Sequence, residues 1–217
     1  MLLENVRGLL TDDFAQYRES IGDDLRALGY EPQWRLLNAC DYGVPQLRPR
    51  ALLVALRPEH IEHFSWPEPS AGHLSVGEAL RSEMHRGGWE GASAWVTSAN
   101  AVAPTLVGGS KKHGGPDLGP TQARKRWAEL GIDGRGVADE APRPGHVGMP
   151  RLTVKMAGIV QGFPAAWPFQ GGKTAAYRQV GNAFPPPVAE AVGRRLALAL
   201  AAGATSDAVS PGLSRAA

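Results

Sequence analysis

A short apolar run at residues 51–56 constrains the fold most, because a run of this length and composition predicts a β-strand. Residues 33–39 are also strand-like, and residues 2–6 have the character of a strand end. Apolar residues at helical spacing predict a helix over residues 12–28, with Gly29 as its stop signal. This opening part of the chain therefore predicts a mixed α/β fold.

Composition changes at residues 58–72, where three prolines indicate a linker. We expect residues 1–69 to form one part of an α/β domain and residues 70–150 to form a separate small, irregular region. Residues 151–201 should return to the first domain, and residues 202–217, which are small and polar, should form a disordered tail.

Further along the chain, local signals predict four short helices. Ser75 and Glu78 have the spacing of a capping box, and Thr153 is placed to cap a helix that runs to about residue 161. Residues 120–130 and 187–201 also have helical character. The remaining sequence of the middle third has little periodicity, so we expect only a small, irregular core there.

Composition and charge narrow the class of protein. The chain has 217 residues, a formal net charge of +2 and a single cysteine, so no intramolecular disulfide can form and a reducing cytoplasm is expected. It has no signal-peptide pattern and no apolar run near the roughly 20 residues that span a bilayer. Residues 81–126 hold seven Arg and Lys against three Asp and Glu, which favours contact with a polyanion.

Polar residues alternate in the segment that enters the predicted strand at residues 51–56. Gln46, Arg48 and Arg50 should share one face if this segment is extended. Guanidinium groups suit phosphate oxygens and the carbonyl oxygens of bases, so these residues are candidates for nucleic-acid contacts. An exposed strand edge carrying ordinary surface arginines explains the pattern about as well.

A glycine-rich segment contains Lys111 and Lys112 but lacks the Gly-Lys-Ser/Thr ending of a phosphate-binding P-loop. It is either a flexible solvated loop or a mobile basic loop that closes on nucleic-acid phosphates. Asn100, Thr105 and Arg124, which lie on either side of it in the sequence, would suit contacts in a DNA groove.

The other chemically active residues give weaker signals. Cys40 is best interpreted as a small buried residue, because Asp41 beside it would raise the pKa of the thiol. His60 and His63 have a spacing found in metal sites but no companion ligands, so we predict no metal site. The carboxylate of Glu4, near a strand end, is by itself more often structural than functional.

Near the C-terminus, Gly181 and Asn182 suggest a turn, and the three prolines at residues 185–187 form a rigid lead-in to a helix. The free N–H groups of such a helix start can bind a ligand, although a well-punctuated helix start is the more common explanation. The aromatic residues Phe163, Trp167 and Phe169 are expected in the core.

Several of these elements occur in one fixed order. They are Glu4-Asn5-Val6, Gln46-x-Arg48-x-Arg50, an irregular basic region, Arg151-Leu152-Thr153, Gln161-Gly162-Phe163-Pro164 and the Gly-Asn-Ala-Phe-Pro-Pro-Pro-Val-Ala segment at residues 181–189. In this order the chain resembles the bacterial DNA cytosine-5 methyltransferases, from their sixth conserved motif to their tenth. Each motif is modest alone, but the ordered set is specific.

The resemblance implies a role for each matching residue. Glu4 resembles the glutamate that binds the flipped cytosine at N3 and its exocyclic amine. Arg48 and Arg50 resemble the two arginines of the Gln-x-Arg-x-Arg motif, the second of which contacts the base near O2. Asn182, with Gly181 before it, resembles the asparagine of the last motif, which helps to build the S-adenosylmethionine pocket.

The resemblance also implies a fold and partners. The fold would be part of a Rossmann-like S-adenosylmethionine-dependent methyltransferase domain, with residues 70–150 inserted as a small target recognition domain. The substrate would be double-stranded DNA, contacted by Gln46, Lys111, Lys112 and Arg124. We expect a cytoplasmic protein, associated with the nucleoid when it binds DNA.

One departure from the family is decisive for the mechanism. The family's glycine-rich cofactor loop and its Pro-Cys nucleophile precede the Glu-Asn-Val motif, and Cys40 follows that motif, so Cys40 does not match the nucleophile. The chain is therefore expected to be a C-terminal half that needs an upstream polypeptide. A catalytically inactive, sequence-specific DNA-binding module and a nonfunctional gene remnant are the alternatives.

Overall fold

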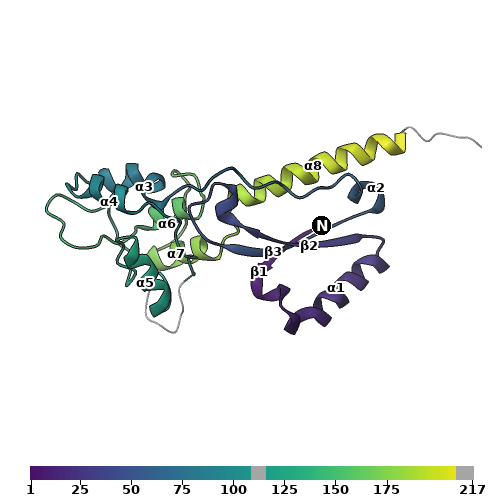
Figure 1. Cartoon of the computed structure of the whole chain (residues 1–217), viewed down its shortest axis with the longest axis horizontal. Helices are drawn as coiled ribbons and strands as arrows, with labels where there is room; N and C mark the ends of the chain where they lie inside the picture. Colours follow the sequence, from purple (N-terminus) through teal and green to yellow (C-terminus); the bar gives the residue numbers. More distant parts are fainter. Residues whose placement is uncertain (109–115, 209–217) are drawn as a thin grey trace, which may run out of the picture. The chain divides into compact units, whose positions relative to one another are not determined.

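The computed structural model describes residues 1–108 and 116–208, and these residues divide into two compact units (Figure 1). The first, here called the sheet unit, comprises Met1–Leu37, Pro49–Pro69 and the chain from Ala189 onward. The second, here called the helical unit, comprises Asn38–Arg48 and Ser70–Val188. Among the described residues, no helix has the length and apolar character needed to cross a membrane.

The sheet unit contains a three-stranded sheet in the order β1-β3-β2. Its strands are β1 (Leu2–Val6), β2 (Glu31–Asn38) and β3 (Pro49–Leu56), so the three expected strand segments are confirmed. Strands β1 and β3 are antiparallel, with Glu4 opposite Leu52. The chain is thus α/β, with Arg50 as the second residue of β3 and Arg48 just before that strand.

Helices cover both faces of this sheet. Helix α1 (Ala15–Ala27) follows two short 3₁₀ turns, η1 (Arg7–Leu10) and η2 (Asp12–Phe14), and confirms the predicted helix. Leu25 of α1 packs against Leu53 and Ala55 of β3. Figure 1 shows α8 (Pro186–Ala208) on the opposite face of the sheet. Because both faces are covered, residues 51–55 of β3 are completely buried.

The short helix α2 (Pro58–Ile61) begins the segment that the sequence analysis interprets as a linker. This segment is tied to α8, because Arg195 Nε donates a hydrogen bond to Ser65 O at 2.9 Å. Gly203 of α8 allows a close approach, since a Cβ there would lie 2.0 Å from His60 Nδ1. The segment is therefore part of the packed sheet unit.

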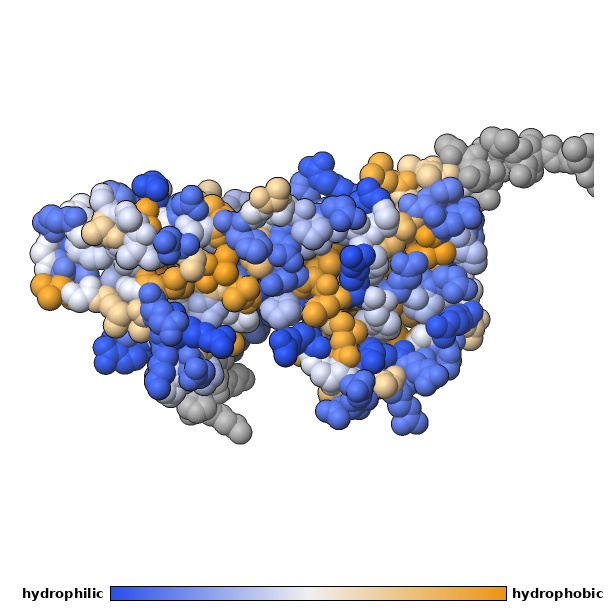
Figure 2. All heavy atoms as spheres, viewed as in Figure 1, coloured by the Kyte–Doolittle hydropathy of each residue, from blue (hydrophilic) through white to orange (hydrophobic). Residues whose placement is uncertain are grey.

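Strand β1, in contrast, is exposed along its whole length. Apolar residues reach solvent on and around it, and Figure 2 shows apolar side chains gathered on the visible surface of the sheet unit. The exposed large apolar residues of this part of the chain are Met1, Leu2, Leu3, Val6, Phe14, Tyr17, Leu28 and Leu36. The sheet unit thus leaves an apolar surface next to an edge strand.

The described residues of the helical unit form one 3₁₀ turn and five α-helices. They are η3 (Ala39–Tyr42), α3 (Val76–His85), α4 (Ala92–Ser98), α5 (Thr121–Glu129), α6 (Val154–Val160) and α7 (Lys173–Asn182). Helix α3 packs against α4 and α6, and α6 packs against α7. Residues 151–188, which the sequence assigned to the first domain, group here with residues 70–150.

The core of the helical unit is the largest apolar cluster among the described residues. It includes Trp95, Trp127 and Tyr177, which are at most 5% exposed. The expectation of a small, irregular core in the middle third was wrong. The apolar residues converge from segments distant in sequence, such as α3, α5 and α6, so no local periodicity reports them.

Local signals at helix starts were more reliable. Ser75 Oγ accepts a hydrogen bond from Glu78 N at 3.2 Å, and the Glu78 carboxylate accepts one from Ser75 N at 3.1 Å, which confirms the capping box of α3. A further hydrogen bond, donated by Ser75 Oγ to Glu78 Oε2 at 2.8 Å, together with the one from Ser75 N, lowers the pKa of Glu78. Thr153 caps α6 as predicted, by accepting a hydrogen bond from Met156 N at 3.1 Å.

Three expectations about helices were wrong. Helices α4 and α7 were missed, because glycine, serine and proline around them hide their short apolar patterns. Gly181 and Asn182 do not form a turn but are the last two residues of α7. Helix α8 continues to Ala208, so residues 202–208 are helical rather than a tail, and residues 209–217 lie outside the described residues.

Candidate functional site

Glu4 and Arg50 form an ion pair on one face of the sheet. Arg50 Nε lies 2.7 Å from Glu4 Oε1, and the side chains are 13% (Arg50) and 28% (Glu4) exposed. The register explains the contact: Glu4 is opposite Leu52, and Arg50 is two residues before Leu52, so the two charged residues are diagonal neighbours on the same face. The sheet therefore fixes this pair.

The environment of Arg50 is partly desolvated. Burial lowers the pKa of its guanidinium, and the neighbouring Glu4 carboxylate opposes that change. Arg50 Nη1 also donates a hydrogen bond to Pro49 O at 2.9 Å, which fixes the orientation of the group. A carboxylate and an oriented guanidinium at one edge of a sheet can together bind a planar ligand that offers both donors and acceptors.

Arg48, two residues earlier, has different surroundings. Its side chain is 1% exposed, and it donates hydrogen bonds from Nη1 to Leu106 O at 2.7 Å and from Nη2 to Gly181 O at 2.7 Å. Nη2 also donates to Ala183 O at 3.0 Å. Arg48 thus joins separate segments of the helical unit, and its interpretation as an ordinary surface arginine was wrong.

Gln46 is also completely buried in the helical unit. Its Nε2 donates to Gln161 Oε1 at 2.8 Å, and its Oε1 accepts a hydrogen bond from Leu106 N at 2.8 Å. Arg48 Nη1 lies 3.5 Å from Gln46 Oε1, so the two side chains do lie on the same side as the alternation predicted. No local pattern of residues indicated that this side faces the interior.

The backbone around Gly181 is tightly packed. A Cβ at Gly181 would lie 2.4 Å from Gly108 Cα, and a Cβ at Gly108 would lie 2.3 Å from Asn182 Oδ1. Side chains are excluded at both glycines, so the segment before residue 109 can approach the end of α7. Asn182 itself is exposed at that end.

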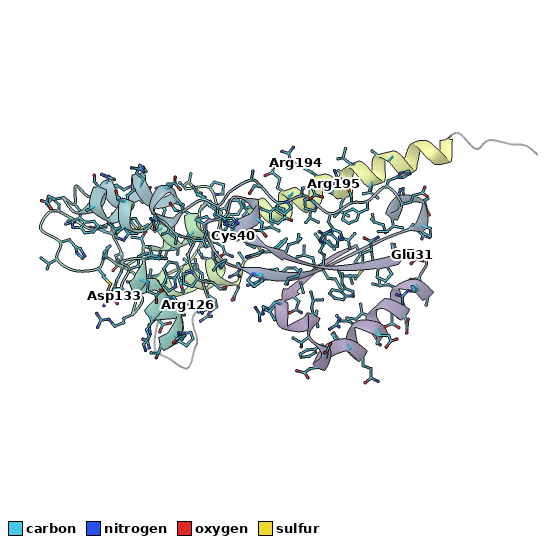
Figure 3. All side chains as sticks on the ribbon, viewed as in Figure 1. Glu31, Cys40, Arg126, Asp133, Arg194 and Arg195 are labelled. Atoms are coloured by element: carbon cyan, nitrogen blue, oxygen red, sulfur yellow. The ribbon has the colours of Figure 1, made fainter. Side chains whose placement is uncertain are left out.

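The structure describes only some of the residues that were predicted to contact DNA. Lys111 and Lys112 lie outside the described residues. Arg124 on α5 is half-buried and donates a hydrogen bond from Nη2 to Thr121 Oγ1 at 3.3 Å. Its neighbours on α5, Lys125 and Arg126, are exposed; Figure 3 labels Arg126. Helix α5 therefore presents a basic surface, of which the sequence analysis singled out one residue.

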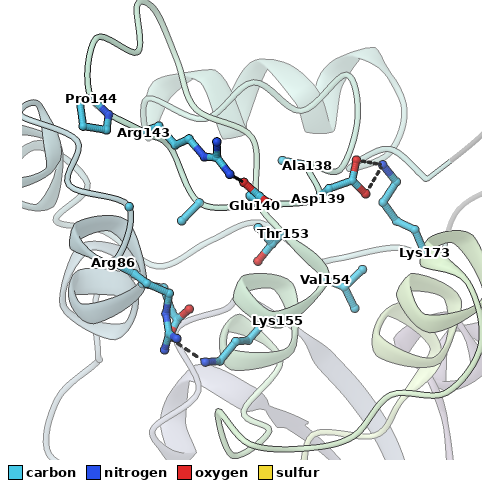
Figure 4. Close-up of a pocket in the computed structure, with 13 residues that line it drawn as sticks. Arg86, Ala138, Asp139, Glu140, Arg143, Pro144, Thr153, Val154, Lys155 and Lys173 are labelled. Carbon is cyan, nitrogen blue, oxygen red and sulfur yellow. Dashed lines mark hydrogen bonds and ion pairs between the residues drawn. The ribbon is translucent and has the colours of Figure 1, made fainter.

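A second charged region of the helical unit borders a cavity of about 590 Å³ (Figure 4). Its buried carboxylate, Glu83, lies 2.7 Å from Arg86 Nη2 and 3.0 Å from Lys155 Nζ. Burial raises the pKa of Glu83, but the hydrogen bonds from Arg86 and Lys155 outweigh that effect and lower it. On the same cavity, Lys173 pairs with Asp139 at 3.0 Å.

Cys40, Asp41 and His73 lie together, which the sequence analysis did not anticipate because His73 is distant along the chain. Cys40 Sγ lies 3.4 Å from Asp41 Oδ1, and His73 Nε2 lies 3.1 Å from the same oxygen. Their potential ligand atoms all lie within 4.8 Å of one another, a spacing that allows a metal ion, and the absence of a metal site stays a prediction. Burial first, and then Asp41, raises the pKa of Cys40 to about 11, as the sequence predicted for Asp41.

Comparison with known proteins identifies relatives of this chain. Residues 1–197 match the family described as C-5 cytosine-specific DNA methylase. The type II methyltransferase M.NaeI of Lentzea aerocolonigenes is 55% identical, over 92% of this chain and 49% of the relative. The type II methyltransferase M.NgoMIV of Neisseria gonorrhoeae is 48% identical, over 92% of this chain and 64% of the relative.

The chain thus spans about half to two thirds of the length of these relatives. Solved structures share the fold at low sequence identity. Schizosaccharomyces pombe Dnmt2 methyltransferase has a TM-score of 0.52 and 14% identity, over 90% of this chain and 66% of that one. The Entamoeba histolytica methyltransferase EhMeth has a TM-score of 0.54 and 13% identity, over 90% and 61%. The family match and the two close relatives show that the chain belongs to the C-5 cytosine-specific DNA methylases.

Proposed function

We propose that the chain is the C-terminal half of a DNA cytosine-5 methyltransferase, which acts on double-stranded DNA in the cytoplasm with S-adenosylmethionine as methyl donor. The sheet unit would be part of a Rossmann-like catalytic domain, and residues 70–150 of the helical unit would be the inserted target recognition domain. The observation that carries this proposal is the Glu4–Arg50 pair, held at 2.7 Å by the register of β1 and β3.

The chemistry explains why such a pair is needed. Cytosine C5 is a poor nucleophile, and addition of a thiolate at C6 turns the ring into an enamine-like species that can attack a methyl group. S-adenosylmethionine, when bound, supplies that methyl group on a sulfonium. Negative charge develops on the ring during the addition, so hydrogen-bonding and cationic groups at N3 and O2 stabilise the transition state. The base must first leave the helix stack.

Each member of the pair has a part in this scheme. Glu4 would bind the base at N3 and at its exocyclic amine, and Arg50 would donate a hydrogen bond to O2. Without a base, the two groups neutralise each other across 2.7 Å. Their limited exposure keeps water from competing with the base, which strengthens both interactions. The pair is therefore preorganised for one extruded pyrimidine.

The buried Arg48 and Gln46 would act by position rather than by contact with the base or with DNA. Arg48 holds the carbonyls of Gly181 and Ala183, on either side of Asn182. The side-chain amide of Asn182 both donates and accepts hydrogen bonds, which fits the polar groups of S-adenosylmethionine. Arg48 would thus fix the segment that contributes Asn182, with Gly181 before it, to the cofactor pocket.

An upstream polypeptide would complete the enzyme. The family's nucleophile is a Pro-Cys cysteine, and the single cysteine here follows alanine, with a thiol pKa raised to about 11. The exposed strand β1 and the apolar residues around it offer a surface that such a polypeptide could cover. The greater length of M.NaeI and M.NgoMIV indicates a source for it.

The test is a complementation assay of tritiated methyl transfer from S-adenosylmethionine to DNA. We expect no transfer by the purified chain, and transfer when the part of M.NaeI outside the matched region is added. In the mixture, Glu4→Gln and Arg50→Ala should each reduce the rate strongly, whereas Arg194→Ala on the exposed side of α8 should not. Turnover by the chain alone would refute the need for a partner.

A second function is favoured by one observation, the extensive core of the helical unit. A unit with its own core can act as a DNA-binding module without catalysis. Sequence-specific DNA binding by the chain, combined with no methyl transfer in any mixture with an upstream segment, would support this alternative over the proposed enzyme.

A further inference from the structure

A carboxylate in the helical unit organises two arginines. Asp133, labelled in Figure 3, has a side chain that is 12% exposed. Its Oδ1 lies 2.9 Å from Arg135 Nε, and its Oδ2 lies 2.9 Å from Arg151 Nε. One negative charge is therefore shared by two guanidinium groups, and the cluster keeps an excess positive charge.

The backbone builds this cluster before any ligand arrives. Asp133 N donates a hydrogen bond to Pro150 O at 2.9 Å, which places the residue before Arg151 beside Asp133. Arg135 N donates to Asp133 Oδ1 at 3.1 Å, which closes a local turn. Hydrogen bonds from Arg135 first, together with those from Arg151, hold the pKa of Asp133 well below its usual range. Asp133 is thus an ionised anchor.

The two arginines are not equivalent. The Arg135 side chain is 73% exposed, and that of Arg151 is 48% exposed. Arg151 is confined, because a Cβ at Gly136 would lie 3.3 Å from its Nη1. Arg135 faces Asp133 through Nε at 2.9 Å and Nη2 at 3.4 Å, so the edge formed by its two terminal nitrogens points away from the carboxylate.

An anchored loop with an apolar tip lies beside the cluster. Val147 is 92% exposed and lines, with Arg135 and Arg151, a cavity of about 620 Å³. The loop is fixed at two points: Trp89 Nε1 donates to His146 O at 3.1 Å, and Gly145 N donates to a Glu90 carboxylate oxygen at 3.0 Å. A fixed, exposed valine next to arginines suits the mixed polar and apolar edge of stacked bases.

The charged groups that line this cavity nearly balance. Three arginines and two carboxylates line it, which leaves one excess positive charge. The arginines are Arg135, Arg143 and Arg151, and the carboxylates are Asp133 and Glu140. An excess of one charge is small for phosphate binding. The orientation of the arginine side chains, rather than the net charge of the lining, therefore distinguishes this site.

We infer that Arg135 reads a guanine in the major groove of the DNA, by donating two hydrogen bonds to O6 and N7, and that Asp133 and Arg151 position it. Guanine is the base that presents two acceptors side by side on that edge. A guanidinium whose rotation is fixed by a carboxylate loses little freedom on binding. This inference rests on the proposed function, because it assumes that the helical unit recognises DNA.

The experiment uses the full chain and duplex DNA selected from a randomised pool by its binding. Each guanine of the selected site is then replaced in turn by 7-deazaguanine, which lacks the N7 acceptor. At one position we expect the wild-type chain to lose roughly 5- to 150-fold in affinity. Arg135→Ala should bind the unmodified site more weakly and show no further loss at that position, and Arg135→Lys, which replaces the guanidinium fork by one ammonium group, should show a smaller loss than the wild type.

Asp133→Asn should weaken the dependence without abolishing binding, since Arg135 remains but is no longer fixed. Arg194→Ala, which removes an equally exposed arginine of the sheet unit, should behave like the wild type. Circular dichroism checks that each variant is folded. If Asp133→Asn does not fold, the comparison of Arg135→Lys and Arg135→Ala with the wild type still tests the inference.

The outcomes separate the inference from the proposed function. If the wild-type chain shows no sequence preference, DNA recognition by the chain and this inference both fail. If it shows a preference but Arg135→Ala keeps the full 7-deazaguanine effect, only the inference fails. If Arg135→Ala weakens binding equally on all sequences and reduces its salt dependence, Arg135 contacts phosphate and base reading is overturned.

Discussion

The helical unit and the sheet unit bury their apolar residues to different degrees. The helical unit encloses a core that includes Trp95, Trp127 and Tyr177, all at most 5% exposed. The sheet unit buries β3 on both faces but leaves every residue of β1 exposed. The helical unit thus encloses an apolar core of its own, whereas the sheet unit leaves apolar residues of an edge strand at its surface.

The Gln-x-Arg-x-Arg motif crosses the boundary between the two units and shows the same contrast. Arg48 belongs to the helical unit and is bonded to backbone carbonyls. Arg50 belongs to the sheet unit and is paired with a partly exposed carboxylate. Identical side chains two residues apart thus have a structural role in one unit and a proposed chemical role in the other.

The largest expected effect comes from removing Arg48, which tests its structural role in the helical unit. Arg48→Ala would leave the buried carbonyls of Leu106, Gly181 and Ala183 without these hydrogen bonds, so we expect the helical unit to lose about 3–4 kcal/mol of unfolding free energy. Urea unfolding followed by tryptophan fluorescence measures this, with Arg194→Ala as a control near zero. A loss below about 1 kcal/mol would contradict the structural role.

Removal of Arg50 from the sheet unit should instead affect methyl transfer more than stability. Arg50→Ala should cost only about 1 kcal/mol of stability, because the ion pair is partly solvated. In the complemented enzyme, however, it should lower the rate of methyl transfer about 10²- to 10³-fold, as expected for loss of a group that stabilises developing charge. If Arg50→Ala destabilised the chain as much as Arg48→Ala, the proposed division of roles would be wrong.

A smaller effect on stability is expected when the pH is lowered, through Asp133 of the helical unit. The pKa of Asp133 is lowered in the folded chain, so its ion pairs stabilise the fold fully above the ordinary value of 3.8, and this stability is lost as the pH falls towards the folded pKa. Asp133→Asn should therefore cost about 1–2 kcal/mol at pH 7, and the difference from wild type should shrink below about pH 4. A difference that stays constant down to pH 2 would mean that Asp133 acts without its charge.

The smallest effect concerns the buried thiol of the helical unit. With a pKa of about 11 instead of the ordinary 9.0, Cys40 should hold about 100-fold less thiolate at neutral pH than an unperturbed cysteine. Alkylation by iodoacetamide should be correspondingly slow. Asp41→Asn should speed it up several-fold, because Asp41 adds to the raised pKa. Rapid alkylation of the wild-type chain at pH 7 would show that the thiol is accessible and reactive.

Sequence patterns predicted those features of the fold that residues close together along the chain determine. The apolar run of β3, the helix at α1 and the caps at Ser75 and Thr153 all depend on neighbouring residues, and the structure confirms them. Motif order also identified the family, which the comparison confirms.

Features that depend on distant contacts were not predictable in this way. The burial of Gln46 and Arg48 depends on backbone groups more than 50 residues away, so alternation predicted their shared direction but not their exposure. The core of the helical unit and the Cys40–Asp41–His73 group likewise form only when separate segments meet. The resemblance placed Glu4 and Arg50 against the same base, and the register of the sheet brings their side chains within 2.7 Å of each other.

The most direct test is a double-mutant cycle on methyl transfer in the complemented enzyme, with Glu4→Gln, Arg50→Ala and the two changes combined. Two groups that hold one base as a unit should give a double variant little slower than the slower single variant. Independent groups would instead give a double variant whose loss is the product of the two single losses, and that result would contradict a shared cytosine site.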